Sequence, residues 1–171
     1  AISKIVIHDR ALVGGTPAEI LRDANDRISG TNKMGLFVTV WFGILDLRNG
    51  TVTYTNAGHE YPAVKHGSGS YELVVRENLP PVATIEGIEY KNETLVLGDG
   101  DSLFLYTDGL TDAKNAEGEH FGIERLTELL GSITGNDPEQ TVKLVNDSIN
   151  AFLGETDRFD DTTMMCVTYH K

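Results

Sequence analysis

Acidic residues stand where two predicted strands end or begin. Asp108 and Gly109 directly follow one predicted strand, and Asp160 and Asp161 precede another. Gly109 would let the backbone turn sharply beside the Asp108 carboxylate. Carboxylates at neighbouring strand ends can bind a hard divalent cation such as Mg²⁺ or Mn²⁺, which favours oxygen ligands and waters. Spacing alone leaves a second interpretation open, because Asp at a strand end more often takes part in a turn.

The overall charge is compatible with both interpretations and excludes other functions. Of the 171 residues, 26 are acidic and 14 are basic, which gives a net charge of −12. This balance argues against nucleic acid as a partner, because phosphate backbones need basic patches, and against an anionic membrane surface. Two roles remain for the carboxylates: a solvated surface, or a site that holds a cation.

Two other side chains that could do chemistry have ordinary alternatives. His59 lies in a loop between Gly58 and Glu60, where it could act as a general acid or simply hydrogen-bond to neighbouring backbone. Cys166 is the only cysteine and lies in an apolar run, which favours a small buried side chain over a catalytic thiol. A single cysteine also favours a reducing, cytoplasmic setting.

Residues with β-branched and aromatic side chains predict a series of short strands joined by turns. The longest, 36–46, is apolar on both faces, so we expect it to be buried. Asn49-Gly50 predicts a hairpin turn into the next strand. Segment 98–101 resembles a metal loop but lacks the ligand spacing of a calcium site, so we expect a hairpin turn that pairs its flanking strands. In chain order, the predicted strands are 36–46, 51–56, 61–65, 71–75, 90–97, 102–107 and 162–169.

Helices are predicted on both sides of this strand-rich block. Apolar spacing indicates a helix from the first residues, and Thr16-Pro17-Ala18-Glu19 has the pattern of a capping box that begins a helix ending near Ser29. Helical spacing returns at 123–133 and, after Asp137, at 138–152. Pairs of helices around antiparallel strands predict an α+β layered domain. The helical arginines could meet phosphate, but such residues are more often solvated; they are Arg10, Arg22 and Arg27.

Five sequence motifs follow one another over nearly the whole chain. They are Met34-Gly35-Leu36-Phe37-Val38-Thr39, Asn56-Ala57-Gly58-His59-Glu60-Tyr61-Pro62, Leu103-Phe104-Leu105-Tyr106-Thr107-Asp108-Gly109-Leu110-Thr111-Asp112-Ala113, Glu119-His120-Phe121-Gly122 and Phe159-Asp160-Asp161-Thr162-Thr163. Together they resemble the bacterial SpoIIE/RsbU-like branch of the metal-dependent (type 2C) protein phosphatases. The combination of motifs is specific, although Thr107-Asp108-Gly109 alone would not be.

The resemblance implies a fold and a reaction. The fold would be a four-layer α-β-β-α sandwich of antiparallel sheets flanked by helices. The reaction would be hydrolysis of a phosphoserine or phosphothreonine ester on a protein by a water that two Mn²⁺ or Mg²⁺ ions activate. In this branch the usual substrate is a phosphorylated anti-sigma-factor antagonist, and an upstream sensor domain often controls the phosphatase.

The resemblance also implies roles for particular residues. Asp108 and Asp160 would be catalytic residues and metal ligands, and Gly109 would shape the loop at the metal site. The residues expected to support these ligands are Asp161, Thr163 and His59.

The sequence departs from the family pattern at its beginning. The family has a metal-bridging Asp, an Asp-x-x-Gly-x-Gly stretch and its first strands ahead of the position of Ala1. Asp9, Asp23 and Asp26 lie in helical patterns and cannot replace the bridging Asp. We therefore expect residues 1–171 to form a single phosphatase domain that is incomplete at its N-terminus, lacks its first strands and is weakly active or inactive.

Two further hypotheses follow from this departure. Absent strands would leave unpaired backbone or apolar surface, which a homodimer could cover. If the parent protein also lacks the bridging carboxylate, the chain would be a noncatalytic domain that binds a phosphoprotein or another partner without hydrolysing it.

Overall fold

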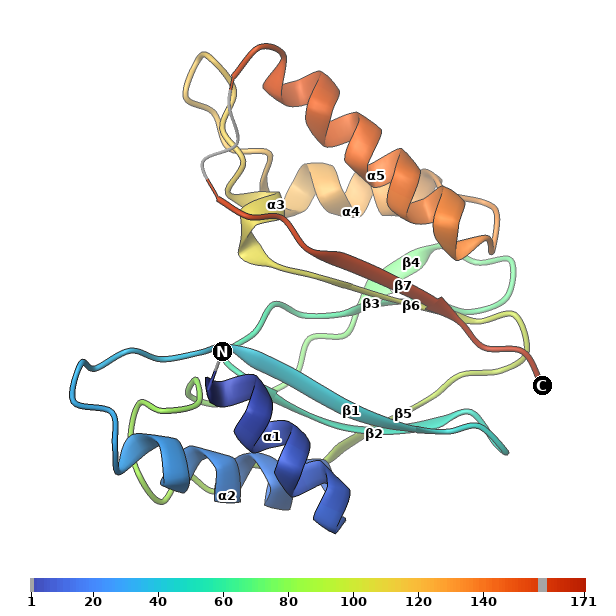
Figure 1. Cartoon of the computed structure of the whole chain (residues 1–171). Helices are drawn as coiled ribbons and strands as arrows, with labels where there is room; N and C mark the ends of the chain where they lie inside the picture. Colours follow the sequence, from blue (N-terminus) through green and yellow to red (C-terminus); the bar gives the residue numbers. More distant parts are fainter. Residues whose placement is uncertain (1, 157–159) are drawn as a thin grey trace. The chain divides into compact units, whose positions relative to one another are not determined.

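The chain forms two compact units in the computed structural model, which describes residues 2–156 and 160–171 (Figure 1). The first unit comprises the residues up to 59 together with 77–96, and the second comprises 60–76 and the residues from 97 onward. Each unit contains one antiparallel sheet and its own helices. The predicted α+β class, with two antiparallel sheets and helices, is confirmed.

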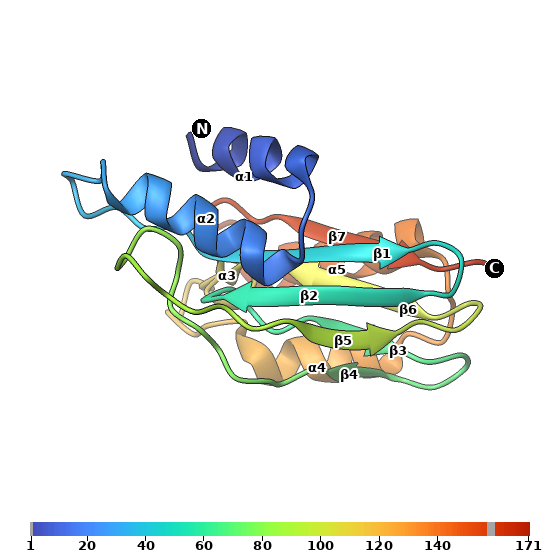
Figure 2. The same cartoon turned by 90° about the horizontal axis from the view of Figure 1, so that it is seen from below.

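The first unit combines two helices with a three-stranded sheet. Its elements are α1 (Ile2–Val13), α2 (Pro17–Ser29), β1 (Val40–Asp46), β2 (Thr51–Ala57) and β5 (Glu93–Val96). The strands lie side by side in the order β1-β2-β5 (Figure 2). Ala18 and Leu21 of α2 belong to the same core cluster as Ala57 of β2, so this helix packs on one face of the sheet.

The predicted capping box at the start of α2 is confirmed. The Thr16 hydroxyl accepts a hydrogen bond from the Glu19 N–H at 3.4 Å, and the Glu19 carboxylate accepts one from the Thr16 N–H at 2.8 Å. These bonds satisfy backbone donors that have no partner within the helix. α1 differs from α2 because none of its residues is buried, and Gly14 and Gly15, both at positive φ, join the two helices.

The long strand predicted at 36–46 is shorter and more exposed than expected. β1 begins at Val40, and Leu36 and Phe37 are 65% and 64% exposed. Asn32 is the local reason, because its side chain donates to the Leu36 carbonyl at 2.5 Å and accepts from the Leu36 N–H at 3.1 Å. In the described part of the chain, β1 pairs only with β2 and so lies at a sheet edge. None of its residues is fully buried.

The second unit combines a four-stranded sheet with three helices. Its elements are β3 (Ala63–Lys65), β4 (Tyr71–Leu73), β6 (Ser102–Tyr106), α3 (Asp108–Thr111), α4 (Gly122–Ser132), α5 (Pro138–Leu153) and β7 (Met164–Thr168). The strand order is β4-β3-β6-β7, so β6 lies inside the sheet, and all its residues are buried.

The helices α4 and α5 cover one face of this second sheet (Figure 1). Leu126 and Leu130 of α4, together with Val145 and Ile149 of α5, share a core cluster with Phe104 of β6. In the described residues, no helix combines the length and the apolar character that crossing a bilayer requires.

The strands predicted to pair around segment 98–101 belong to different sheets, so that pairing is wrong. β5 pairs with β2, whereas β6 pairs with β3 and β7. Segment 98–101 does form a tight turn, closed by a 3.0 Å hydrogen bond from the Asp101 N–H to the Gly98 carbonyl. The Asp101 carboxylate also accepts hydrogen bonds from the N–H groups of Gly98 and Gly67, at 2.8 and 2.7 Å. These bonds fasten the turn to the connection between β3 and β4.

Candidate metal-binding site

The two acidic segments lie at the adjoining ends of β6 and β7. The antiparallel register runs as far as Tyr106 opposite Met164, so β6 ends where β7 begins. Asp108 follows β6 as the first residue of α3, and Asp160 and Asp161 come shortly before β7. The two strands are therefore neighbours, which is what a shared site for both segments requires.

Hydrogen bonds fasten the two segments to each other beyond the last strand pair. The Thr107 N–H donates to the Thr163 carbonyl at 3.0 Å, and the Thr163 N–H donates to the Thr107 hydroxyl at 3.0 Å. The Thr162 hydroxyl donates to the Gly109 carbonyl at 3.1 Å. Both chain neighbours of Asp108 are thereby held in place.

Gly109 is needed at this position for a different reason from the predicted one. Its φ lies outside the positive range, so the turn from β6 into α3 uses backbone angles that other residues also adopt. A β-carbon here would lie 2.4 Å from the Asp161 carbonyl oxygen, which is closer than such atoms approach. The absence of a side chain is what lets the two segments lie against each other.

Asp108 and Asp160 offer carboxylate oxygens at this end of the sheet. Both residues are exposed, and one Asp160 oxygen accepts a hydrogen bond from the Asp161 N–H at 2.7 Å. Within residues 2–156 and 160–171, no group of three or more His, Cys, Asp or Glu side chains is placed to hold a metal ion. Two carboxylates fit Mg²⁺ or Mn²⁺, because proteins commonly bind such ions through one or two carboxylates while waters complete the shell. They do not fit a closed zinc or calcium cage.

The other predicted site residues have different surroundings. Asp161 and Thr163 are exposed members of the segment that precedes β7, and Phe159 of the same motif lies outside the described residues. His59 lies in the first unit, where its N–H donates to the Asn56 side chain at 2.8 Å and its carbonyl accepts from that side chain at 2.9 Å. This two-way bond shapes the loop after β2, and a role for His59 in the chemistry stays a prediction.

Thr107 and Thr162 are site residues that sequence reasoning does not single out. Their hydroxyls link the two acidic segments, although neither side chain resembles a metal ligand. The sequence feature that could have pointed to them is a threonine next to an acidic residue at each strand end. Short hydroxyl side chains often hydrogen-bond to nearby backbone groups.

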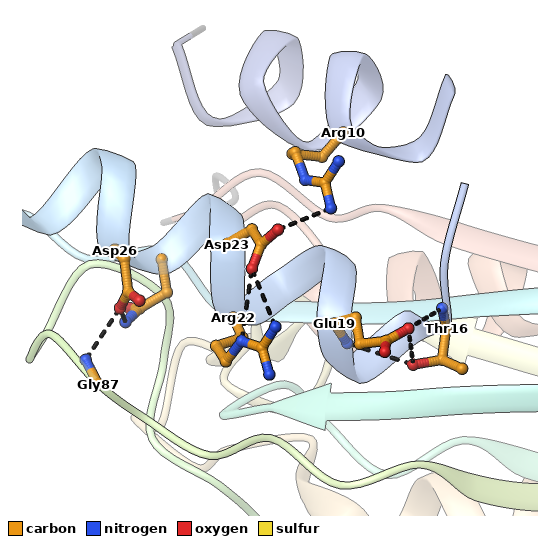
Figure 3. A network of polar contacts seen from close by, with 8 residues as sticks. Arg10, Thr16, Glu19, Arg22, Asp23, Asp26 and Gly87 are labelled. Atoms are coloured by element: carbon orange, nitrogen blue, oxygen red, sulfur yellow. Dashed lines mark hydrogen bonds and ion pairs between the residues drawn. The ribbon is translucent and has the colours of Figure 1, made fainter. Parts of the chain in front are cut away.

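Two of the helical arginines are paired with an acidic residue (Figure 3). Arg10 of α1 places its Nη2 atom 2.6 Å from Oδ2 of Asp23 in α2, and its side chain is only 15% exposed. Arg22 places its Nη2 atom 3.3 Å from the other carboxylate oxygen of Asp23. The Arg10–Asp23 contact joins α1 to α2, so Arg10 is neither solvated nor offered to a phosphate.

Cys166 is a partly buried thiol in the second unit. Its sulfur lies 3.4 Å from the Tyr71 hydroxyl. Burial raises the pKa of the Cys166 thiol, and burial also raises the pKa of Tyr71 to about 12. Both groups therefore stay neutral near pH 7, which agrees with a structural role for this cysteine.

Comparisons with known proteins identify one family over nearly the whole chain. The family model described as Stage II sporulation protein E (SpoIIE) matches residues 2–170. Protein IcfG from Synechocystis sp. is 32% identical over 150 residues, which are 86% of this chain and 23% of IcfG. Phosphoserine phosphatase RsbP from Bacillus subtilis is 29% identical over 68 residues, which are 40% of this chain and 17% of RsbP. The chain thus matches less than a quarter of the length of either relative.

A solved structure shares the fold. The phosphatase domain of the cell fate determinant SpoIIE from Bacillus subtilis, in a Mn-presoaked form, superposes with a TM-score of 0.67 at 16% identity. The match covers 98% of this chain and 73% of that chain. At this level of identity the likeness concerns the fold, with its two antiparallel sheets and their helices.

Proposed function

The chain belongs to the SpoIIE family, in the SpoIIE/RsbU-like branch of the metal-dependent (type 2C) protein phosphatases, and from this membership we propose that the intact protein is a serine/threonine phosphatase. The reaction is hydrolysis of a phosphoserine or phosphothreonine ester on a regulatory protein. The observation that carries the proposal is the family match over residues 2–170. The adjoining ends of β6 and β7, which bear Asp108 and Asp160, support it.

In this proposal Asp108 and Asp160 hold Mn²⁺ or Mg²⁺, and the intact protein uses two such ions. A bound divalent cation supplies a more acidic water as nucleophile and neutralises negative charge on the phosphoryl oxygens. Gly109 allows the Asp108 segment to approach the Asp161 carbonyl, and Thr163 joins the segment after Asp160 to β6. These contacts of the chain itself hold the backbones of the two acidic segments together before any ion binds.

The proposed substrate is a phosphorylated anti-sigma-factor antagonist. The name of the relative RsbP, a phosphoserine phosphatase, supports a phosphoserine on the substrate protein. Both relatives are much longer than the matched region, which supports control by an upstream sensor domain in the intact protein. The single cysteine supports a reducing, cytoplasmic setting for this reaction.

Residues 1–171 by themselves are proposed to have weak activity or none. Among the described residues, no three His, Cys, Asp or Glu side chains lie close enough together to hold a metal ion. Catalysis by two metal ions needs protein ligands for both ions. Turnover of p-nitrophenyl phosphate by this chain, with Mn²⁺ and at the rate of the parent protein, would contradict the proposal.

The decisive experiment measures phosphate release from a phosphoserine peptide by the intact parent protein with Mn²⁺. We expect Asp108→Asn and Asp160→Asn each to lower turnover at least about 100-fold, the scale on which loss of one electrostatic stabiliser acts. Asp147→Asn is the control, because Asp147 lies on α5 and pairs with Lys143 at 2.7 Å. Full activity in both site variants would overturn the assignment. Binding of the phosphopeptide without any turnover would favour the noncatalytic alternative.

A homodimer is proposed to cover exposed apolar surface in the first unit. Ile2 of α1 lines a cavity of about 470 Å³ together with Met34, Leu36 and Phe37 of the loop before β1. All four of these residues are more than half exposed. Apolar patches of this kind commonly mark surfaces that another protein covers.

A further inference from the structure

The Thr107 hydroxyl bonds across the candidate site and not within its own helix. Thr107 is the N-cap of α3, a position where threonine usually accepts a hydrogen bond from the N–H groups of the following helix. Its side chain makes no such bond to α3. It accepts instead from the Thr163 N–H at 3.0 Å and donates to the Asp161 carbonyl at 3.4 Å.

The backbone at Thr107 explains why the hydroxyl is needed there. In a continued antiparallel pair, Thr107 and Thr163 would exchange two backbone hydrogen bonds. The first is made, because the Thr107 N–H donates to the Thr163 carbonyl at 3.0 Å. The second is not, because the Thr107 carbonyl accepts from the Leu110 N–H at 3.0 Å as the chain turns into α3. The hydroxyl takes the place of that carbonyl, so strand pairing continues for one residue while the helix already begins.

Thr162, in the segment before β7, makes a second link to the segment that contains Asp108. Its hydroxyl donates to the Gly109 carbonyl at 3.1 Å, and Gly109 itself lies against the Asp161 carbonyl with no room for a β-carbon. The residues on both sides of Asp108 are thus tied to the three residues that follow Asp160.

We propose that Thr107 and Thr162 are positioning residues that fix the separation of the Asp108 and Asp160 carboxylates for a divalent cation. This inference rests on the proposed function and goes beyond its ligand assignment. The groups that the Thr107 hydroxyl bonds belong to the exposed residues Asp161 and Thr163, so water can replace a bond lost at Thr107 at little cost in stability. The Thr162 hydroxyl bonds instead to Gly109, which is buried. Cation binding depends on ligand placement, and residues behind the ligands tune metal affinity by about 10- to 100-fold.

The first experiment titrates the intact parent protein with Mn²⁺ and follows the free ion by electron paramagnetic resonance. Thr107→Val removes the hydroxyl at nearly constant shape, and we expect it to weaken Mn²⁺ binding about 10- to 100-fold. Thr107→Ser keeps the hydroxyl and is expected to restore most of the affinity. Thr162→Val is expected to act in the same direction as Thr107→Val. Unchanged affinity in Thr107→Val, or an equal loss in Thr107→Ser, would overturn the inference.

The matched control is Thr127→Val, because the Thr127 hydroxyl donates at 2.7 Å to the Ile123 carbonyl within α4. This variant loses the same kind of bond away from the acidic segments, and we expect its Mn²⁺ affinity to equal that of the wild type.

The second experiment measures amide hydrogen exchange in the metal-free intact protein. Thr107→Val deprives the Thr163 N–H of its acceptor, so this amide is expected to exchange faster, whereas Thr107→Ser and Thr127→Val leave it unchanged. Unchanged exchange in Thr107→Val overturns the inference even where Mn²⁺ binding is lost, because the loss then has another cause. A wild-type protein that binds no Mn²⁺ overturns the proposed metal site itself. If only the positioning role of Thr107 and Thr162 is wrong, the wild-type protein still binds Mn²⁺.

Discussion

Gly109 and Asp161 meet so closely that a β-carbon on Gly109 would lie 2.4 Å from the Asp161 carbonyl oxygen. Because the obstacle is backbone and not the end of a flexible side chain, we expect Gly109→Ala to lower the free energy of unfolding by about 1–3 kcal/mol. Urea denaturation measures this change. Gly131→Ala is the control, since a β-carbon at that position in α4 meets nothing within 4 Å. We expect it to stabilise the chain by up to about 1 kcal/mol, and equal effects of both substitutions would refute the packing argument.

Lys65 is a fully buried lysine that holds the segment after α4 to β3. Its ammonium donates to the carbonyl oxygens of Ile133 and Gly135 at 3.0 and 2.7 Å. Lys65→Met leaves both carbonyls without this donor, so we expect the free energy of unfolding to fall by about 2 kcal/mol or more. Thermal and urea denaturation measure the loss. Lys143→Met is the control, because Lys143 is exposed, and we expect no measurable change from it.

Asp101 makes the stability of the second unit depend on pH in the acidic range. Burial acts to raise the pKa of Asp101, but hydrogen bonds from His66 and from the N–H groups of Gly98 and Gly67 outweigh burial and hold the pKa below its usual value. The folded chain therefore takes up this proton at a lower pH than the unfolded chain. The resulting stability is present above the unfolded pKa of about 3.9 and is lost as the pH falls through the folded value.

We accordingly expect the wild-type free energy of unfolding to fall more steeply than that of Asp101→Asn as the pH drops below about 5. Urea denaturation in steps of pH measures both slopes. Parallel curves for the two proteins would show that Asp101 does not carry this dependence.

The proposed homodimer predicts a change of mass in solution. Multi-angle light scattering of the 171-residue chain is expected to give a dimer, and Phe37→Glu is expected to give a monomer, because it places a charge beside the apolar cavity. Leu144→Glu is the control, since Leu144 is an exposed apolar residue on α5 in the second unit. A wild-type chain that stays monomeric at every concentration tested would reject the dimer.

The helices could be predicted because their signals act within a few residues. The capping box at Thr16 and the Asp137-Pro138 pair satisfy backbone groups of the adjacent turn, and α2 and α5 form where these signals indicate. Strand partners depend on residues far apart. Segment 98–101 has the local signature of a hairpin turn, but its Asp101 bonds to Gly67, 34 residues away, and this contact has no local signal.

The location of the candidate site could be predicted from the sequence, but the contacts that hold its two acidic segments together could not. Asp108 and Asp160 both adjoin strong strand signals, so neighbouring strands were enough to bring their segments together. The direction of the Thr107 hydroxyl and the close approach of Gly109 to the other segment depend on side-chain rotamers and backbone spacing. Residue spacing along the chain encodes neither of these.

The surface position of α1 determines where the chain opens first. This helix has no buried residue, and Gly14 and Gly15 join it to α2, so releasing it uncovers little apolar surface. Its amides are expected to exchange with deuterium through small local fluctuations, whereas those of the fully buried β6 wait for global unfolding. Gly14 and Gly15 are exposed, so a protease can cut the chain between α1 and α2. The strand that leads to Asp108 would still be folded after that cut.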